Sequence, residues 1–240
     1  NGNNEISLDK IEIISRKLKK NYSVKRLGTL PKLLKKQIKL DIKNITSKKR
    51  NFANLNFVKI PNIMGILNLT PDSFSDGGKF NSKNSGIKRA LKMFQSGARI
   101  IDVGGESTRP GSKGINAQLE WGRINNILKS ISKKIPISMD TRKSEVMEKG
   151  IKLGVRIIND VSGLNYDPET INILKKYKIP FIIHHSQGTP ENMQNNPKYK
   201  NELLDIYDFF EKKIKLLRSI GIKHNNIILD PGIGFGKNLK

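Results

Sequence analysis

The chain has 240 residues, a formal net charge of +24 and no cysteine. A protein of this length buries roughly 70% of the surface that its unfolded chain exposes, enough for one large globular domain. The lack of cysteine excludes a disulfide framework and a thiolate metal site. No run of about 18 apolar residues predicts a membrane span, and no apolar signal segment opens the sequence, so we expect a cytoplasmic protein without a membrane partner.

The positive charge raises the question of nucleic-acid binding, because clustered Lys and Arg bind phosphate backbones. Lys far outnumbers Arg, and it accompanies heavy use of Asn and Ile, a combination that low-GC coding produces. Aromatic residues make up 6% of the chain and are not interleaved with basic clusters as stacking platforms are. We therefore favour a solvated, Lys-rich surface over a nucleic-acid partner, with some steering of anionic ligands.

Residues 1–56 are a basic N-terminal segment that differs from the rest of the chain. Apolar residues recur there with broken helical periodicity around Gly28 and Pro31, which predicts short helices or a strand packed against the main domain. A basic helix on a membrane surface is the sharper alternative, although the segment has few aromatic anchors. The pattern assigns no chemistry to this segment.

An apolar run ends abruptly in a polar loop within residues 62–78, NIMGILNLTPDSFSDGG. The run lacks the alternation of a half-solvated strand, so we expect a strand covered on both faces, as in parallel sheets. Pro71 and a Gly-Gly pair then break regular structure. The strand therefore delivers Asn68 and the loop behind it to one end of a sheet.

Strand-like and helix-like stretches alternate along the rest of the chain. We predict strands at 62–69, 99–104, 135–140, 155–160, 179–184 and 226–230, and helices at about 85–97, 116–133, 143–153, 168–177 and 199–220. Repeated βα units with short loops imply a parallel sheet, which winds either into an open doubly wound sheet or into a barrel.

Polar side chains end three of these predicted strands: Asp140, Asn159 and Asp230. Because the carboxyl ends of parallel strands meet at one edge, we expect these side chains to lie together. Carboxylates supply only hydrogen-bond acceptors, whereas an amide both donates and accepts. Taken singly, Asp140 and Asp230 are also typical of helix caps, so the pattern alone leaves both interpretations open.

Two other features suggest chemistry at first sight. The sequence GIGFGK at 232–237 fails the phosphate-loop pattern, because Asn238 follows where Ser or Thr is required. His184 and His185 are adjacent and would point to opposite faces of a strand, which disfavours a shared metal site. No Ser-His-Asp triad is supported by the spacing.

Residues 62–78 closely resemble the first signature of the dihydropteroate synthase family, and IIDVGGESTRPGS at 100–112 resembles the second. The elements SMDT, IINDVSG, HSQGTP and LDPGIGFGKN then follow in family order. The resemblance covers about residues 57–240 and implies a (β/α)8 TIM barrel, present here as about six βα units behind the basic extension 1–56. We expect this stretch alone to be unstable or inactive, because an unclosed barrel exposes sheet edges.

The resemblance also implies a transferase that joins (7,8-dihydropterin-6-yl)methyl diphosphate to 4-aminobenzoate in folate biosynthesis, with Mg²⁺ bound by Asn68 and a homodimer for the full-length enzyme. Asn68, Thr108 and Asp140 are the implied catalytic residues. The implied substrate-binding residues are Ser73, Phe74, Thr108, Arg109, Pro110, Asp140, Asn159, Asp230 and Phe235. His185 takes a position that we interpret as structural, and Ser186 stands where Met is usual.

A pterin-binding methyltransferase on the same barrel is the closest alternative. It shares the three polar strand ends but not the two loop signatures, TPDSFSDGG and GGESTRP, which therefore favour the synthase. A basic nucleic-acid-binding protein is the alternative from another class, and steep salt-dependent binding to DNA would support it.

Overall fold

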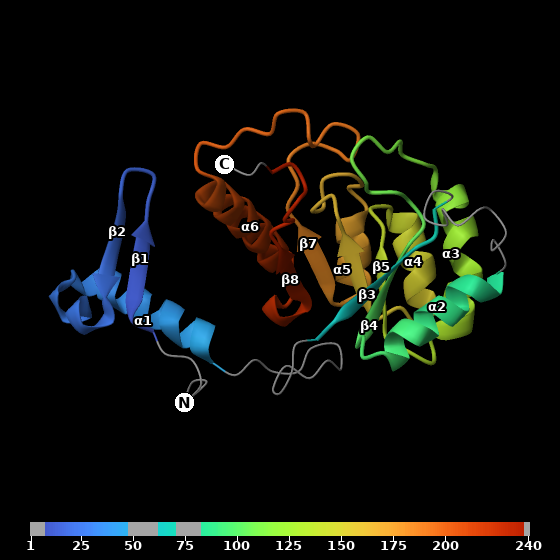
Figure 1. The fold of residues 1–240 in the computed structure, drawn as a ribbon, viewed down its shortest axis with the longest axis horizontal. Helices are drawn as coiled ribbons and strands as arrows, with labels where there is room; N and C mark the ends of the chain where they lie inside the picture. Colours follow the sequence, from blue (N-terminus) through green and yellow to red (C-terminus); the bar gives the residue numbers. More distant parts are fainter. Residues whose placement is uncertain (1–7, 48–61, 71–82, 238–240) are drawn as a thin grey trace.

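The computed structural model describes residues 8–47, 62–70 and 83–237. These residues form a small two-stranded antiparallel sheet and a six-stranded parallel sheet with helices packed against it (Figure 1). Ser73 and Phe74 of the first predicted loop lie outside the described residues.

The small sheet belongs to the N-terminal segment. Strands β1 (Lys10–Ile14) and β2 (Lys19–Ser23) pair antiparallel and are followed by the short 3-10 helix η1 (Val24–Thr29) and helix α1 (Lys32–Thr46). Figure 1 shows this hairpin beside helix α6 (Glu202–Ser219). Arg16 in the hairpin turn forms ion pairs with Asp205 and Asp208 of α6. Such partly exposed pairs contribute little to stability.

The main sheet has the alternating order that the sequence predicts, with element ends shifted by a few residues. Its strands are β3 (Met64–Asn68), β4 (Ile100–Gly104), β5 (Ile137–Asp140), β6 (Ile157–Asp160), β7 (Phe181–His184) and β8 (Ile227–Asp230). The helices between them are α2 (Lys83–Gln95), α3 (Ala117–Ile131), α4 (Ser144–Lys152), α5 (Thr170–Tyr177) and α6, and the short 3-10 helix η3 (His224–Asn226) precedes β8. Within the three described ranges, no helix is both long and apolar enough to cross a bilayer.

Strand order decides between the two predicted windings. Each strand from β3 to β8 pairs in parallel with the next strand along the chain. A doubly wound sheet would reverse direction at a switch point, whereas unbroken sequential order is the winding of a (β/α)8 barrel. The described sheet is open, with β3 and β8 at its edges, and Ile66 on β3 is 60% exposed. The fold is therefore an incomplete barrel.

The strand register separates two faces of the sheet. Outward side chains such as Ile101, Met139 and Phe181 are fully buried against the helices and form the main apolar core. Inward side chains form a smaller apolar cluster around Ile100 and Ile157. Because paired residues in a sheet point to the same face, the inner row continues upward from this apolar floor to the polar strand ends.

Gly105 directly follows β4, and the close approach of the α3 backbone leaves no room there for a side chain. A Cβ at this position would lie 2.7 Å from the backbone carbonyl oxygen of Glu120 and 3.0 Å from Cγ2 of Ile124, both in α3. A helix backbone cannot yield as the tip of a long side chain can. Gly105 thus sets how closely α3 approaches the end of β4. Gly122, in the same helix, would meet nothing within 4 Å.

We predict that Gly105→Ala lowers the free energy of unfolding by about 1–3 kcal/mol, because the new methyl group overpacks the contact with α3. The matched control Gly122→Ala should raise it by about 0.5–1 kcal/mol, since it replaces glycine in a helix interior. Urea unfolding followed by circular dichroism measures both changes. Equal stabilities for the two variants would contradict this account of Gly105.

Candidate functional site

Four strand ends form one inward-facing row. Asn68 pairs with Gly104, Gly104 with Asp140, and Asp140 with Asn159. At the far side of the sheet, Asp230 pairs with His184. The even spacing from Ile182, the partner of Asn159, to His184 puts Asp230 on the same inner face. The structure therefore brings the predicted residues Asn68, Asp140, Asn159 and Asp230 to one rim.

Gly104 leaves room between two of these side chains. A Cβ there would lie 3.3 Å from Oδ2 of Asp140 and 3.4 Å from Oδ1 of Asn68. Both atoms are oxygens, the donor type that hard cations prefer. Across the described ranges, no three His, Cys, Asp or Glu side chains cluster as a protein-only metal site would require. A single side-chain oxygen such as Asn68 Oδ1 suits an ion that keeps most of its water ligands.

The amide orientation of Asn159 is set by Asp102, a buried carboxylate one layer below the rim. Asn159 Nδ2 donates to Asp102 Oδ2 at 3.0 Å. Burial raises the pKa of Asp102, and the polar side chains of Ser138 and Asn159 oppose that rise. While Asp102 is ionised, turning the amide over would place Oδ1 against a carboxylate oxygen with no donor between them. Asn159 Oδ1 is buried and has no hydrogen-bond partner among the described residues. A buried acceptor without a partner costs free energy, which a ligand N–H group that reached it would offset.

Burial raises the pKa of Asp140 well above its ordinary value of 3.8, and the negative charges of Asp102, Glu120, Asp160 and Glu106 raise this pKa further. A ligand that presents N–H donors or positive charge would stabilise the carboxylate and lower its pKa again. The rim is thus rich in acceptors and favours donor-rich ligands.

Asp140 and Asp230 differ in whether they stabilise the backbone after their strands. Helix α4 begins after its N-cap Lys143, so Asp140 is not the cap of that helix. Asp230 Oδ1 accepts a hydrogen bond from the backbone N–H of Gly232 at 2.8 Å, which stabilises the turn after β8. Asp230 therefore has a turn role in addition to its position on the inner rim.

The loop at 107–114 follows β4 and contains three predicted site residues. Thr108 is half-buried, whereas Arg109 and Pro110 are exposed. Ser112 Oγ donates to the carbonyl oxygen of Ser107 at 2.7 Å, which closes the loop on itself. At its tip, the backbone N–H of Gly111 donates to the carbonyl of Pro190 at 2.8 Å, in the segment after β7. The loop therefore reaches across the barrel mouth, as its green trace shows in Figure 1.

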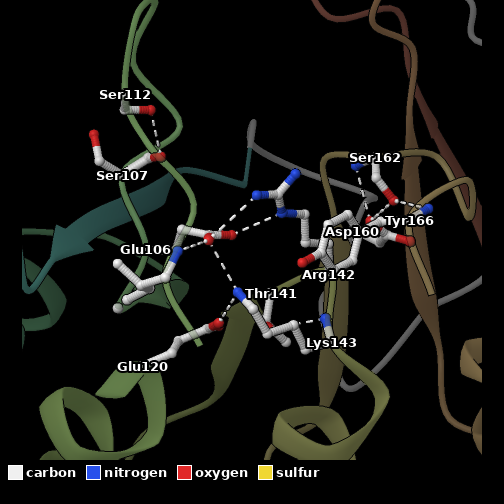
Figure 2. Close-up of polar contacts among 12 residues, drawn as sticks. Glu106, Ser107, Ser112, Glu120, Thr141, Arg142, Lys143, Asp160, Ser162 and Tyr166 are labelled. Atoms are coloured by element: carbon white, nitrogen blue, oxygen red, sulfur yellow. Dashed lines mark hydrogen bonds and ion pairs between the residues drawn. The ribbon is translucent and has the colours of Figure 1, made fainter. Parts of the chain in front are cut away.

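A buried group of charges lies beneath this loop (Figure 2). Glu106 accepts from Arg142 Nε at 2.8 Å and pairs with Lys143 Nζ at 3.0 Å. Lys143 also pairs with Glu120 at 2.6 Å. Burial raises the pKa of Glu106, but hydrogen bonds from Arg142, the Ile115 backbone and Lys143 outweigh burial and leave that pKa below its ordinary value. Glu106 is therefore a carboxylate held in its ionised form.

His184 and His185 have different neighbours. The His184 ring meets Phe235 edge-on at 4.5 Å between centroids, whereas the His185 ring meets Phe209 of α6 at 4.9 Å. Burial, the charge of Lys237 and His184 lower the pKa of His185 to about 4, so that His185 is neutral near pH 7. Lys237 Nζ also bonds the carbonyl oxygens of His185 and Phe235 at 3.2 and 3.0 Å. These contacts fold the glycine-rich loop onto the end of β7.

A cavity of about 110 Å³ lies beside the rim. Its lining includes Arg142, Val161, Tyr166, Ser186 and Phe235. Ser186 Oγ donates to Met193 Sδ at 3.9 Å. Met193 therefore supplies apolar surface beside Ser186, the position at which the family resemblance led us to expect methionine. A larger cleft lies at Arg16 and α6. Neither this cleft nor the smaller cavity is lined by the strand-end residues Asn68, Asp140, Asn159 and Asp230.

Sequence reasoning missed Asp102 and the buried charges beneath the loop. A signal for Asp102 was present, because a carboxylate interrupts the apolar run 100–103 and such a residue is buried only with a partner. The other missed residues were visible as charged neighbours of the recognised motifs: Glu106, Glu120, Arg142 and Lys143.

Residues 64–240 match the family of pterin-binding enzymes. The dihydropteroate synthase of Synechocystis is 43% identical over 177 residues. The dihydropteroate synthase structure from Clostridium difficile with pteroic acid is 43% identical, with a TM-score of 0.69, over 77% of this chain and 68% of that one. The Xanthomonas albilineans enzyme with 4-aminobenzoic acid is 33% identical, with a TM-score of 0.68, over 74% of this chain and 63% of that one.

The matched stretch is shorter than the relatives. The alignment to the Synechocystis protein covers 73% of this chain and 61% of that relative. The chain thus spans about three fifths of the length of the curated relatives that it matches first.

We predict that Asp140→Asn stabilises the chain near neutral pH. Folding raises the pKa of Asp140 above 3.8, so the stability linked to this group is fully present below that value and is lost as the pH rises through the folded-state pKa. The variant should unfold at higher urea concentration than the parent at pH 7–8, and the difference should shrink toward about pH 4. Glu145→Gln, which removes an exposed carboxylate from α4, is the control. Parallel stability curves for Asp140→Asn and the parent would refute the prediction.

Proposed function

Because this chain belongs to the family of pterin-binding enzymes, we propose that it acts in a dihydropteroate synthase, which joins (7,8-dihydropterin-6-yl)methyl diphosphate to 4-aminobenzoate and releases diphosphate. The observation that carries the proposal is the acceptor-rich inner rim, which holds Asp140, Asn159 and Asp230 at the ends of three parallel strands. Donor-poor ligands would displace water from these half-buried acceptors without replacing its hydrogen bonds, at a cost that a pterin avoids.

A pterin presents an amino group and a ring N–H along one edge. Asp140 and Asp230 match these donors as acceptors, and Asn159 Oδ1 offers a third acceptor whose direction Asp102 maintains. We propose this arrangement as the pterin clamp.

We propose Mg²⁺ as the cofactor and Asn68 as its protein ligand. The fit rests on the Asn68 side-chain oxygen at the inner rim, because Mg²⁺ prefers oxygen ligands and keeps several of its waters. When bound, it would offset negative charge on the departing diphosphate.

The loop at 107–114 supplies the proposed contacts to the second substrate. Thr108 would meet the diphosphate, while Arg109 and Pro110 would face 4-aminobenzoate, whose carboxylate suits an exposed guanidinium. Phe235 completes this side of the proposed pocket. Ser73 and Phe74 keep the same proposed role, although they lie outside the described residues.

In the proposed reaction, the bond from the exocyclic methylene carbon to the diphosphate oxygen breaks, and a bond from that carbon to the amine nitrogen forms. The nitrogen then loses a proton, and diphosphate leaves with the electron pair of the broken bond. Asp140 would stabilise positive charge that develops on the pterin ring, and the loops would exclude water that could intercept it. The family resemblance favours a dissociative path.

We propose a homodimer for the whole enzyme, and we propose the cytoplasm as its location, because a diphosphate substrate does not cross membranes unaided. Residues 57–240 would be the pterin-binding domain, with residues 1–56 as a separate segment. We propose no nucleic-acid or membrane partner.

We predict that the chain binds the pterin diphosphate and that Asp140→Ala or Asp230→Ala raises its Kd roughly 10- to 100-fold, the loss expected for a hydrogen bond to a charged group. Asp41→Asn, on the exposed face of α1, should leave the Kd unchanged. Isothermal titration calorimetry measures binding, which is the primary readout because we expect the open barrel to turn over poorly.

Formation of dihydropteroate that requires both substrates is the second readout. Affinity for methyltetrahydrofolate without affinity for the pterin diphosphate would instead identify the methyltransferase alternative. Failure of both rim variants to weaken pterin binding would contradict the proposed clamp.

A further inference from the structure

Both ends of the loop at 107–114 meet at a single carboxylate. Glu106 immediately precedes the loop, and its Oε1 accepts a hydrogen bond at 2.8 Å from the backbone N–H of Ile115, immediately after the loop. Glu106 is 6% exposed, so little water competes for this bond. The carboxylate therefore closes the base of the loop.

The Glu106 carboxylate also contacts two cations that follow β5, the strand that carries Asp140. Arg142 donates to Oε2 of Glu106 through Nε at 2.8 Å and to Oε1 through Nη2 at 3.3 Å. Lys143 adds an ion pair at 3.0 Å. Figure 2 shows Arg142 and Lys143 directed at Glu106. The two cations follow Asp140 by two and three residues, so they hold Glu106 at a fixed place relative to the rim.

Arg142 is itself fixed from its other side. Its guanidinium carbon lies 4.0 Å from the ring centroid of Tyr166, a cation–π contact. Both side chains line the cavity beside the rim. The two hydrogen bonds to Glu106 and the contact with the Tyr166 ring together leave the guanidinium little conformational freedom.

Stability alone is a poor explanation for these charges. A buried ion pair pays a desolvation cost that often cancels its attraction, so such pairs are better explained by the arrangement that they specify. The arrangement specified here is the base of one loop relative to one strand end.

We propose that Glu106 is a positioning residue: with Arg142 and Lys143 it joins the two ends of the loop at 107–114 and holds the loop over the rim. It touches no reacting atom. The consequence for the second substrate rests on the proposed function, because Arg109 and Pro110 would meet 4-aminobenzoate only if the loop is held in place.

Glu120 provides a matched comparison. It is fully buried and pairs with Lys143 at 2.6 Å, so it belongs to the same group of charges. It lies in α3, and none of its hydrogen bonds or ion pairs given by the structure reaches the loop or Ile115. Loss of Glu120 should therefore disturb the charge balance without releasing the loop.

Hydrogen exchange followed by mass spectrometry, without any substrate, tests the proposal. In Glu106→Gln, we expect the backbone N–H groups of residues 107–109 and 111–115 to exchange about tenfold faster or more, because a hydrogen bond to a charged group is lost. In Glu120→Gln they should stay within about twofold of the parent. The amides of β5 report on the barrel core and should not change in either variant. Unchanged loop exchange in Glu106→Gln, or equal acceleration in both variants, would overturn the proposal.

Arg142→Lys keeps the positive charge but removes the bidentate fork, so it covers the case in which Glu106→Gln fails to fold. It should accelerate exchange in 107–115 by a smaller factor and leave β5 unchanged, and a loop that exchanges as in the parent would count against the proposal. The Ile115 amide resonance gives a separate signature, since loss of its charge-assisted bond in Glu106→Gln should shift the proton upfield.

Comparing the Kd values of the two ligands distinguishes a positioning role of Glu106 from a general disruption of the site. With the pterin diphosphate saturating, Glu106→Gln should raise the Kd of 4-aminobenzoate about tenfold, while the Kd of the pterin diphosphate stays within about twofold. Equal weakening of both ligands would refute a positioning role. If the parent chain binds no pterin diphosphate, the proposed function fails, and the substrate-free exchange experiment still decides the role of Glu106.

Discussion

The parallel pairing of six consecutive strands is the constraint on which the site depends. The register places Asn68, Gly104, Asp140 and Asn159 side by side, and it gives all of them the same inward direction. A shift of one residue in any strand would turn its terminal side chain toward the helices. The apolar outer faces oppose such a shift, because residues such as Met139 and Phe181 are fully buried only in this register. Packing of the apolar core therefore fixes the inward direction of the polar side chains at the strand ends.

The electrostatics of the mouth follow from that alignment. Several carboxylates converge on one end of the sheet, and the nearby cations do not neutralise them equally. Arg142 and Lys143 are engaged by Glu106 and Glu120, whereas burial and its negative neighbours keep the pKa of Asp140 high. A ligand that brings hydrogen-bond donors or positive charge would therefore stabilise the carboxylates inside the barrel. A highly basic chain presents an acceptor-rich pocket, which shows that net charge describes the surface rather than the site.

Sequence patterns predicted the βα alternation and the rim, because both depend on short-range periodicity and on the position at which each strand ends. The barrel winding needed the family resemblance, since periodicity is the same in a doubly wound sheet. The partners of Glu106 could not be derived, because Arg142 lies 36 residues away and pairing of buried charges depends on tertiary contact. The turn role of Asp230 was foreseen in part, whereas Asp140 proved not to cap α4. The roles assigned to Ser73, Phe74 and the other site residues stay predictions.

The segment after β5 links the pocket floor to the loop above it. Asp140 faces the inner rim, and Arg142 and Lys143 then turn to the carboxylate at the loop base. Thr141 Oγ1 accepts from the Lys143 backbone N–H at 3.3 Å, which tightens the turn between them. One residue separates Asp140 from Arg142 and two separate it from Lys143, so the backbone that positions the pocket floor also positions the two cations that hold Glu106. Adjacent residues of one turn therefore serve both the pocket floor and the loop base.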